Sequence, residues 1–346
     1  MNPKNFIDYE ESSDLLQNPV ALRERLSRNG YLFFKNLVDA GKVDKVRHGV
    51  YGILEKYELI DRNSSHEAKW TGKKVDASSL LCDGEIGMQI SKLRSIRELY
   101  NTEEIIGVQK KVFDGEVFPW VENVDRVRAY LPGISRMMVA GQLASTATMA
   151  HQDHFPFRNK KGGKDTFNTT WVPLMDIDES VGGLTLMKNS HLKGFHKHFI
   201  KKGDVKGVAS SIEEMSEWKS SGYVPAVGES DPDKKVEWLR SNYHSGDVLI
   251  FSRLTVHGGC PNTSDKIRLS TDFRYQRKGT YTSWKSFHRL PWTLKFGSEI
   301  RRTINELGIK DELGDRVWET MHNIQGPSMV KGNTIESRIL EVAKTL

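Results

Sequence analysis

Cysteine is scarce in this sequence, with only Cys82 and Cys260 among 346 residues. Two cysteines cannot form a disulfide framework, so a reducing compartment is expected. The sequence also lacks any run approaching the roughly 18 apolar residues that a membrane-spanning helix needs. Its first residues lack the apolar stretch of a secretory signal. We therefore predict a cytoplasmic protein without a membrane partner.

A strong excess of charge of one sign is missing too. The chain has 51 Lys and Arg against 45 Asp and Glu, a net charge of +6, and both signs are mixed along it. This mixture gives no basic stripe for nucleic acid, so we predict no nucleic-acid partner. The small positive balance favours anionic small molecules as ligands. The sequence leaves the oligomeric state open.

No internal repeat or low-complexity tract divides the chain, and we predict a single domain over residues 1–346. Apolar residues at helical spacing predict helices over 14–29, 42–57 and 103–114, within a mainly helical part, 1–138. The aromatic run 31–34 predicts a short buried strand between the first two helices.

The pattern changes at residue 139. From there to 281, short β-rich runs alternate with Gly, Asn, Asp and Ser, and strands are expected over 169–174, 183–187, 247–251 and 267–275. Many short strands are typical of a sandwich, barrel or jelly roll. The long polar segment 200–240 interrupts them and is interpreted as a lid-like insertion. Residues 282–346 return to helical character.

Metal chemistry enters with His151-Gln152-Asp153, the single His-x-Asp of the chain. On a strand, residues i and i+2 face the same side, so both side chains can reach one ion. Two histidines and one carboxylate form the triad of non-haem Fe(II) oxygenases, which leaves positions open for an oxo-acid and O₂. By itself the pattern is weak, because it arises by chance in a chain with 11 histidines.

The residues downstream strengthen the pattern. The expected strand 247–251 is followed by His257-Gly258, then by Asn262, and then by Arg268 on the next strand. In this order the motifs resemble the phytanoyl-CoA dioxygenase family of Fe(II)/2-oxoglutarate oxygenases. The resemblance covers roughly residues 30–275 and includes the segments 29–34, 151–157, 171–177, 182–184, 189–191 and 246–251. It implies a double-stranded β-helix, a cupin-like jelly roll, surrounded by helices.

The resemblance also implies a set of ligands. His151, Asp153 and His257 would bind Fe(II), and Arg268 would pair with the distal carboxylate of 2-oxoglutarate. A guanidinium suits that carboxylate because it can form two parallel hydrogen bonds. Some members carry a hydroxyl residue where this chain has Gly259. One contact to 2-oxoglutarate would then either be missing or come from Gln142, Thr148 or the neighbouring Thr146.

Arg268 has a second interpretation. Its strand alternates apolar residues with Arg268, Ser270, Asp272 and Arg274, and alternation by itself favours a face turned to solvent. The resemblance instead turns that face toward an active cavity. Arg274 would then bind substrate or compete for 2-oxoglutarate.

Two further residues are candidates for substrate contact, each with a simpler alternative. His154 follows the His-x-Asp motif, although a surface or structural histidine is the commoner case. Trp171 could wall the pocket, although core packing explains most buried tryptophans.

The implied activity is that of an Fe(II)/2-oxoglutarate-dependent dioxygenase acting on a small molecule, as in biosynthesis. Hydrogen abstraction would lead to hydroxylation, desaturation or oxidative cyclisation, with release of succinate and CO₂, and ascorbate would keep the iron reduced. A 2-oxoglutarate-dependent demethylase of a macromolecule and a non-catalytic β-sandwich binding protein remain alternatives. The sequence does not specify the substrate.

Overall fold

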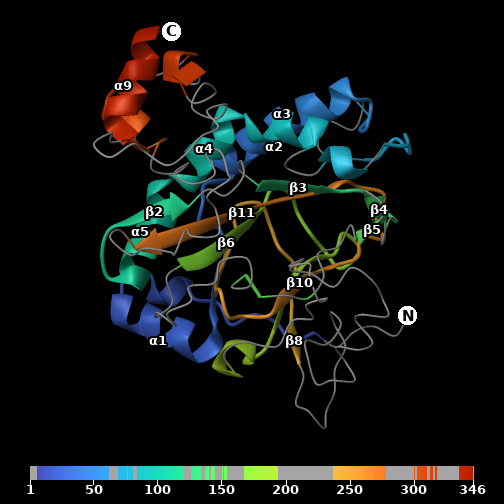
Figure 1. The fold of residues 1–346 in the computed structure, drawn as a ribbon. Helices are drawn as coiled ribbons and strands as arrows, with labels where there is room; N and C mark the ends of the chain where they lie inside the picture. Colours follow the sequence, from blue (N-terminus) through green and yellow to red (C-terminus); the bar gives the residue numbers. More distant parts are fainter. Residues whose placement is uncertain are drawn as a thin grey trace.

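The structure is a computed structural model. It describes residues 6–61, 69–75, 77–80, 84–120, 126–133, 137–139, 142–144, 150, 152–153, 167–193, 237–277, 300, 302–309, 312–314, 316–317 and 335–345. Figure 1 shows a core of antiparallel strands with helices against it. None of the described helices is long and apolar enough to cross a bilayer.

Three helices of the first part agree with the sequence prediction apart from their ends, and two further helices were not predicted. The helices are α1 (Pro19–Asn29), α2 (Ala40–Lys56), α3 (Glu85–Ser91), α4 (Arg94–Tyr100) and α5 (Glu103–Phe113), with 3₁₀ turns at Ser13–Leu15 and Ala77–Leu80. α1 begins later than predicted because the side chain of Asn18 accepts from the amide of Ala21 and Pro19 takes the first turn. The spacing of apolar residues did not predict α3 and α4, which are short.

The strands form one large sheet and two small ones. They are β1 (Tyr31–Phe34), β2 (Val117–Trp120), β3 (Arg126–Tyr130), β4 (Met137–Val139), β5 (Gln142–Ala144), β6 (Phe167–Pro173), β7 (Gly183–Met187), β8 (Trp238–Leu239), β9 (Val248–Ser252), β10 (His257–Cys260) and β11 (Arg268–Arg277). The large sheet has the order β1-β9-β6-β11-β2, with β3 also on β11. A second sheet has the order β10-β7-β8, and β4 pairs with β5. The prediction of a mainly β core with surrounding helices is confirmed at this level.

One hydrophobic core joins the helices to the large sheet. Val43 and Leu54 of α2 belong to it, as do Ile96 of α4 and Leu269 and Phe273 of β11. A separate small cluster lies in the last part of the chain and consists of Ile300, Ile304, Val317, Ile339 and Val342. It includes residues of α9 (Ile335–Thr345), which agrees with the helical character expected there. The single domain stays a prediction.

The predicted lid-like insertion lies outside the described residues up to 236. Its last residues are described and are not part of a lid, because Trp238 and Leu239 form β8 and pair with Met187 and Leu186 of β7.

Both faces of β11 are buried, which overturns the solvent-facing interpretation of its polar residues. Every residue of the strand except Arg277 is buried. Its apolar face packs toward the helices, where the ring of Phe273 lies 5.2 Å from that of Tyr100. Its polar face, with Arg268, lines a cavity instead of meeting water.

The turn before β9 fixes the end of β1. Gly246 has a left-handed φ of 101°, and its carbonyl accepts from the amide of Val38 at 3.0 Å. The side chain of Asp247 accepts from the amides of Asn36 at 3.0 Å and His244 at 2.8 Å. These bonds anchor the two neighbouring strands of the sheet.

We expect Gly246→Ala to lower the free energy of unfolding by about 2–3 kcal/mol, since a side chain there is strained. The added Cβ would also lie 2.6 Å from the carbonyl oxygen of Val38. Gly52→Ala is the control, because its Cβ meets nothing within 4 Å, and a helical alanine should add about 0.4–1 kcal/mol. Chemical denaturation measures both, and equal stability of the two variants would contradict the strain argument.

Candidate active site

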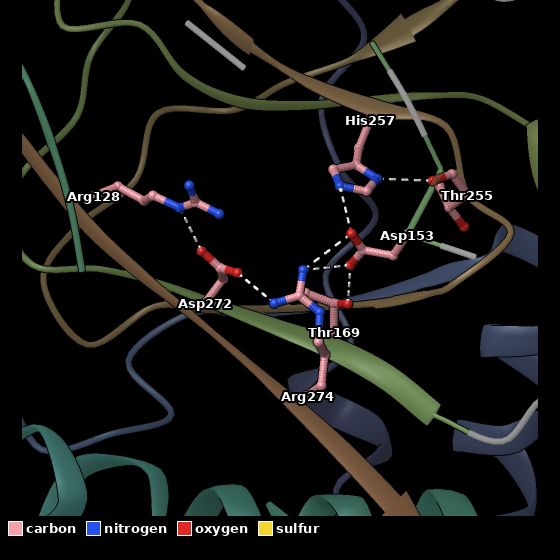
Figure 2. Close-up of polar contacts among 7 residues, drawn as sticks. All are labelled: Arg128, Asp153, Thr169, Thr255, His257, Asp272 and Arg274. Carbon is pink, nitrogen blue, oxygen red and sulfur yellow. Dashed lines mark hydrogen bonds and ion pairs between the residues drawn. The ribbon is translucent and has the colours of Figure 1, made fainter. Parts of the chain in front are cut away.

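Asp153 is the predicted carboxylate ligand of the metal, and side chains of the large sheet donate hydrogen bonds to it. It is 2% exposed. Nη2 of Arg274 donates to both of its oxygens at 3.0 Å, and the hydroxyl of Thr169 donates to Oδ2 (Figure 2). These contacts engage both oxygens of the buried carboxylate and fix its orientation.

His257 opens β10 and faces the same carboxylate. Its Nδ1 lies 2.9 Å from the carbonyl oxygen of Thr255. Because a carbonyl only accepts, this contact assigns the proton to Nδ1 and leaves a lone pair on Nε2. Nε2 lies 3.8 Å from Oδ1 of Asp153. That separation is too long for a hydrogen bond, and it suits two ligands that each approach one metal ion to about 2 Å.

The third predicted ligand, His151, lies outside the described residues, as do Thr148 and His154. Its neighbours are described: Ala150 is buried, and the side chain of Gln152 donates to the carbonyl of Leu254. This bond ties the segment of Asp153 to the segment that leads into β10. Among the described residues no three His, Cys, Asp or Glu side chains lie close enough to hold a metal.

Arg268 is buried, and it has no carboxylate partner in the part of the chain that the structure describes. It is 3% exposed. Its Nη1 donates to the carbonyl of Cys260 at 2.8 Å, and its guanidinium lies 4.4 Å from the ring centroid of Tyr130. Its Nε has no hydrogen-bond partner among those same residues, and burial holds the pKa of the guanidinium below the ordinary value. A buried cation of this kind is costly without an anion, so the site is suited to bind one.

Gly182 makes room for this guanidinium. It has φ of 93°, and a Cβ there would lie 2.9 Å from Nη1 of Arg268 and 2.6 Å from the carbonyl oxygen of Cys260. The Gly182-Gly183 pair of the sequence motif therefore has a steric role beside the arginine.

One cavity joins His257 to Arg268. It lies between the two larger sheets, and its other lining residues are Arg128, Tyr130, Thr169, Trp171, Leu184, Phe251, Gly259, Ser270, Asp272 and Arg274. Arg274 and Trp171, two of the residues predicted to contact substrate, are thus at the cavity. Trp171 also packs on Tyr243, with ring centroids 4.7 Å apart. Gln142 begins β5, and its contact to 2-oxoglutarate stays a prediction.

A series of paired charges lies at the cavity beside the side chains predicted to bind metal. Nε of Arg128 donates to Oδ1 of Asp272 at 2.9 Å, and Nη1 of Arg274 donates to Oδ2 of Asp272 at 2.8 Å (Figure 2). Sequence reasoning missed Arg128 and Thr169 and gave Asp272 no role. Arg128 and Tyr130 lie two residues apart on β3 and both line the cavity. The sequence did not predict this strand.

Comparison with known proteins identifies what this site is similar to. The profile of the phytanoyl-CoA dioxygenase (PhyH) family matches residues 26–270. The 1-deoxypentalenic acid 11-beta-hydroxylase of Streptomyces arenae is 23% identical over 314 residues, covering 85% of this chain and 94% of that protein. The enzyme of the same name from Streptomyces exfoliatus is 25% identical over 297 residues, covering 84% and 93%.

A solved structure supports the fold alone. The epimerase SnoN in complex with Fe3+, alpha ketoglutarate and nogalamycin RO has a TM-score of 0.50 at 20% identity, over 80% of this chain and 91% of that chain.

Asp272→Asn should lower the free energy of unfolding by about 3 kcal/mol, because two guanidinium groups lose a shared, nearly buried counter-charge. Glu98→Gln is the control: it removes an exposed pair with Lys45, 2.7 Å long, and should cost less than about 1 kcal/mol. Denaturant titration of both variants measures the difference. Equal costs would show that Asp272 carries no more than a surface charge.

Proposed function

Because the chain belongs to the phytanoyl-CoA dioxygenase family, we propose that it uses its cavity to oxidise an anionic small molecule. The chain is an iron- and 2-oxoglutarate-dependent oxygenase. The observation that carries the site assignment is that His257, whose Nε2 faces Oδ1 of Asp153, lines the same cavity as Arg268, a buried arginine that has no carboxylate partner among the described residues.

We assign the iron to His151, Asp153 and His257. The lone pair on Nε2 of His257 and Oδ1 of Asp153 face each other across 3.8 Å, and both side chains are buried, which fits a shared metal ion. When bound, Fe(II) supplies the redox chemistry that consumes O₂ and 2-oxoglutarate and yields succinate and CO₂. The protein holds the ligands, orients the substrate C–H bond and keeps water from the cavity.

We assign the distal carboxylate of 2-oxoglutarate to Arg268. Its orphaned Nε and its burial between Tyr130 and Cys260 support this assignment. Gly259 lines the cavity and has no hydroxyl to add. Gln142 and Thr148 remain our candidates for a further contact.

The charges of the cavity support an anionic substrate. Among the described residues, Arg128, Arg268, Arg274 and Asp272 line the cavity, and Asp153 lies directly behind it on Arg274, so these three arginines and two aspartates leave one positive charge. The charges of Fe(II) and of the 2-oxoglutarate dianion cancel each other, so the remaining positive charge of the protein is available to the substrate. Arg128 is its natural location, because 29% of its side chain is exposed against 5% for Arg274. A single carboxylate matches this charge, and two relatives are named for an acid.

Hydroxylation is the outcome that we favour over desaturation and oxidative cyclisation, because both of these relatives are hydroxylases. The described residues that line the cavity form no basic stripe for a macromolecular substrate, and a non-catalytic binding protein would not need the facing ligand atoms. Trp171 and His154 remain candidate substrate contacts.

We extend the proposal to the finer fold. The large sheet and the β10-β7-β8 sheet enclose the cavity, as the two sheets of a double-stranded β-helix would. The shared core of helices and large sheet supports a single oxygenase domain.

Fe(II) and 2-oxoglutarate added to metal-free protein without oxygen should produce a weak visible absorption band. His257→Ala should abolish it. Arg268→Ala should raise the 2-oxoglutarate concentration needed by at least about tenfold, since a charged hydrogen bond is lost. Arg277→Gln, exposed on the same strand, should match the wild type. A folded wild-type protein without the band would refute the assignment.

Succinate release should distinguish a carboxylic acid from its methyl ester. We would compare 1-deoxypentalenic acid and other terpenoid acids with their esters in the wild type and in Arg128→Gln. An acid that is turned over should lose about tenfold or more in kcat/KM with the variant, while the ester should be equally poor with both proteins. Acids and esters that respond alike to Arg128→Gln would overturn the anionic-substrate proposal.

A further inference from the structure

We infer that Arg274 and Thr169 are positioning residues that hold Oδ2 of Asp153, so that the carboxylate presents only Oδ1 to the metal. This inference rests on the proposed iron site. It replaces the expectation that Arg274 binds substrate or 2-oxoglutarate.

The two oxygens of Asp153 have unequal surroundings. Oδ2 accepts from the hydroxyl of Thr169 and from Nη2 of Arg274, whereas Oδ1 shares that Nη2 and faces Nε2 of His257 at 3.8 Å (Figure 2). Oδ1 therefore lies on the side of the histidine lone pair. Oδ2 lies on the side of the sheet.

The donors lie on two neighbouring strands of the large sheet. Arg274 of β11 and Thr169 of β6 are directly paired across the antiparallel ladder at the centre of the large sheet. Asp153 lies in a turn. The sheet thus dictates the orientation of a ligand whose own segment is not a strand.

Arg274 is itself fixed at both ends. Its Nη1 binds Asp272 at 2.8 Å while its Nη2 binds Asp153. Asp272 is in turn held by Arg128 at 2.9 Å. Both terminal nitrogens of Arg274 thus donate to protein carboxylates. For this reason we infer that this buried arginine positions Asp153 and does not bind substrate or 2-oxoglutarate.

Single-oxygen ligation has a chemical consequence. A carboxylate that offered both oxygens would occupy one more coordination position, and the oxygenase needs its open positions for 2-oxoglutarate and O₂. Groups that hydrogen-bond a metal ligand commonly change metal affinity about 10–100-fold when they are replaced.

Co(II) titration of the metal-free protein without oxygen or 2-oxoglutarate tests the inference, with visible absorption as the readout. Thr169→Val removes one hydroxyl at constant shape, and Arg274→Lys keeps the charge but cannot reach both carboxylates. Both should raise the Kd for Co(II) by about 10–100-fold. Thr169→Ser, which keeps the hydroxyl, and the exposed Arg277→Gln should retain the wild-type Kd.

The outcomes separate the two proposals. Wild-type protein that fails to bind Co(II), or binding that survives His257→Ala, would refute the iron site itself. Binding that requires His257 but is equally tight or tighter in Thr169→Val and Arg274→Lys would refute the positioning role alone. If Arg274→Lys does not fold, the Thr169→Val and Thr169→Ser pair decides, and melting temperatures of the metal-free variants establish folding.

Discussion

The buried ion pair between Arg274 and Asp153 is the contact on which the site depends. It joins a turn residue to the central strand of the large sheet, at two distances of 3.0 Å. Both partners leave water, so their desolvation must be offset by good geometry and by further bonds to Thr169 and Asp272. Such a pair adds little net stability but strongly opposes any structure in which one partner is displaced. It thereby specifies where the turn that carries Asp153, our proposed metal ligand, can lie.

The sheet that supplies this arginine is buried on both sides, and each face of β11 has a different task. Leu269, Phe273 and Tyr275 bind it to the helices through the hydrophobic core. Arg268, Asp272 and Arg274 point to the cavity between the sheets. Charged side chains are tolerated there because they form pairs or await an anion. Packing on one face and chemistry on the other thus come from the same strand.

Local sequence patterns predict many of the helices and strands of this arrangement. The strands 31–34 and 183–187 have the predicted bounds, and α2 and α5 differ by only a few terminal residues, because hydrophobic spacing and caps act locally. The polar face of β11 could not be placed by alternation alone, since alternation does not tell solvent from a lined cavity. The sequence did not identify Arg128 and Thr169 as site residues, because their positions at the site depend on pairing between strands that are far apart in the chain.

The three arginines of the cavity differ in function because they differ in counter-charge, not in residue type. Arg274 has two aspartates and serves as a support. Among the described residues Arg268 contacts a carbonyl and an aromatic ring and no carboxylate, which is why we propose that it binds a carboxylate of 2-oxoglutarate. Arg128 shares Asp272 with Arg274 and keeps part of its side chain exposed. A second anion entering this cavity would therefore meet Arg128 first, since Arg268 is buried and Arg274 is already bonded at both ends. The order of their exposure therefore supports our proposal that co-substrate and substrate bind to separate arginines in one cavity.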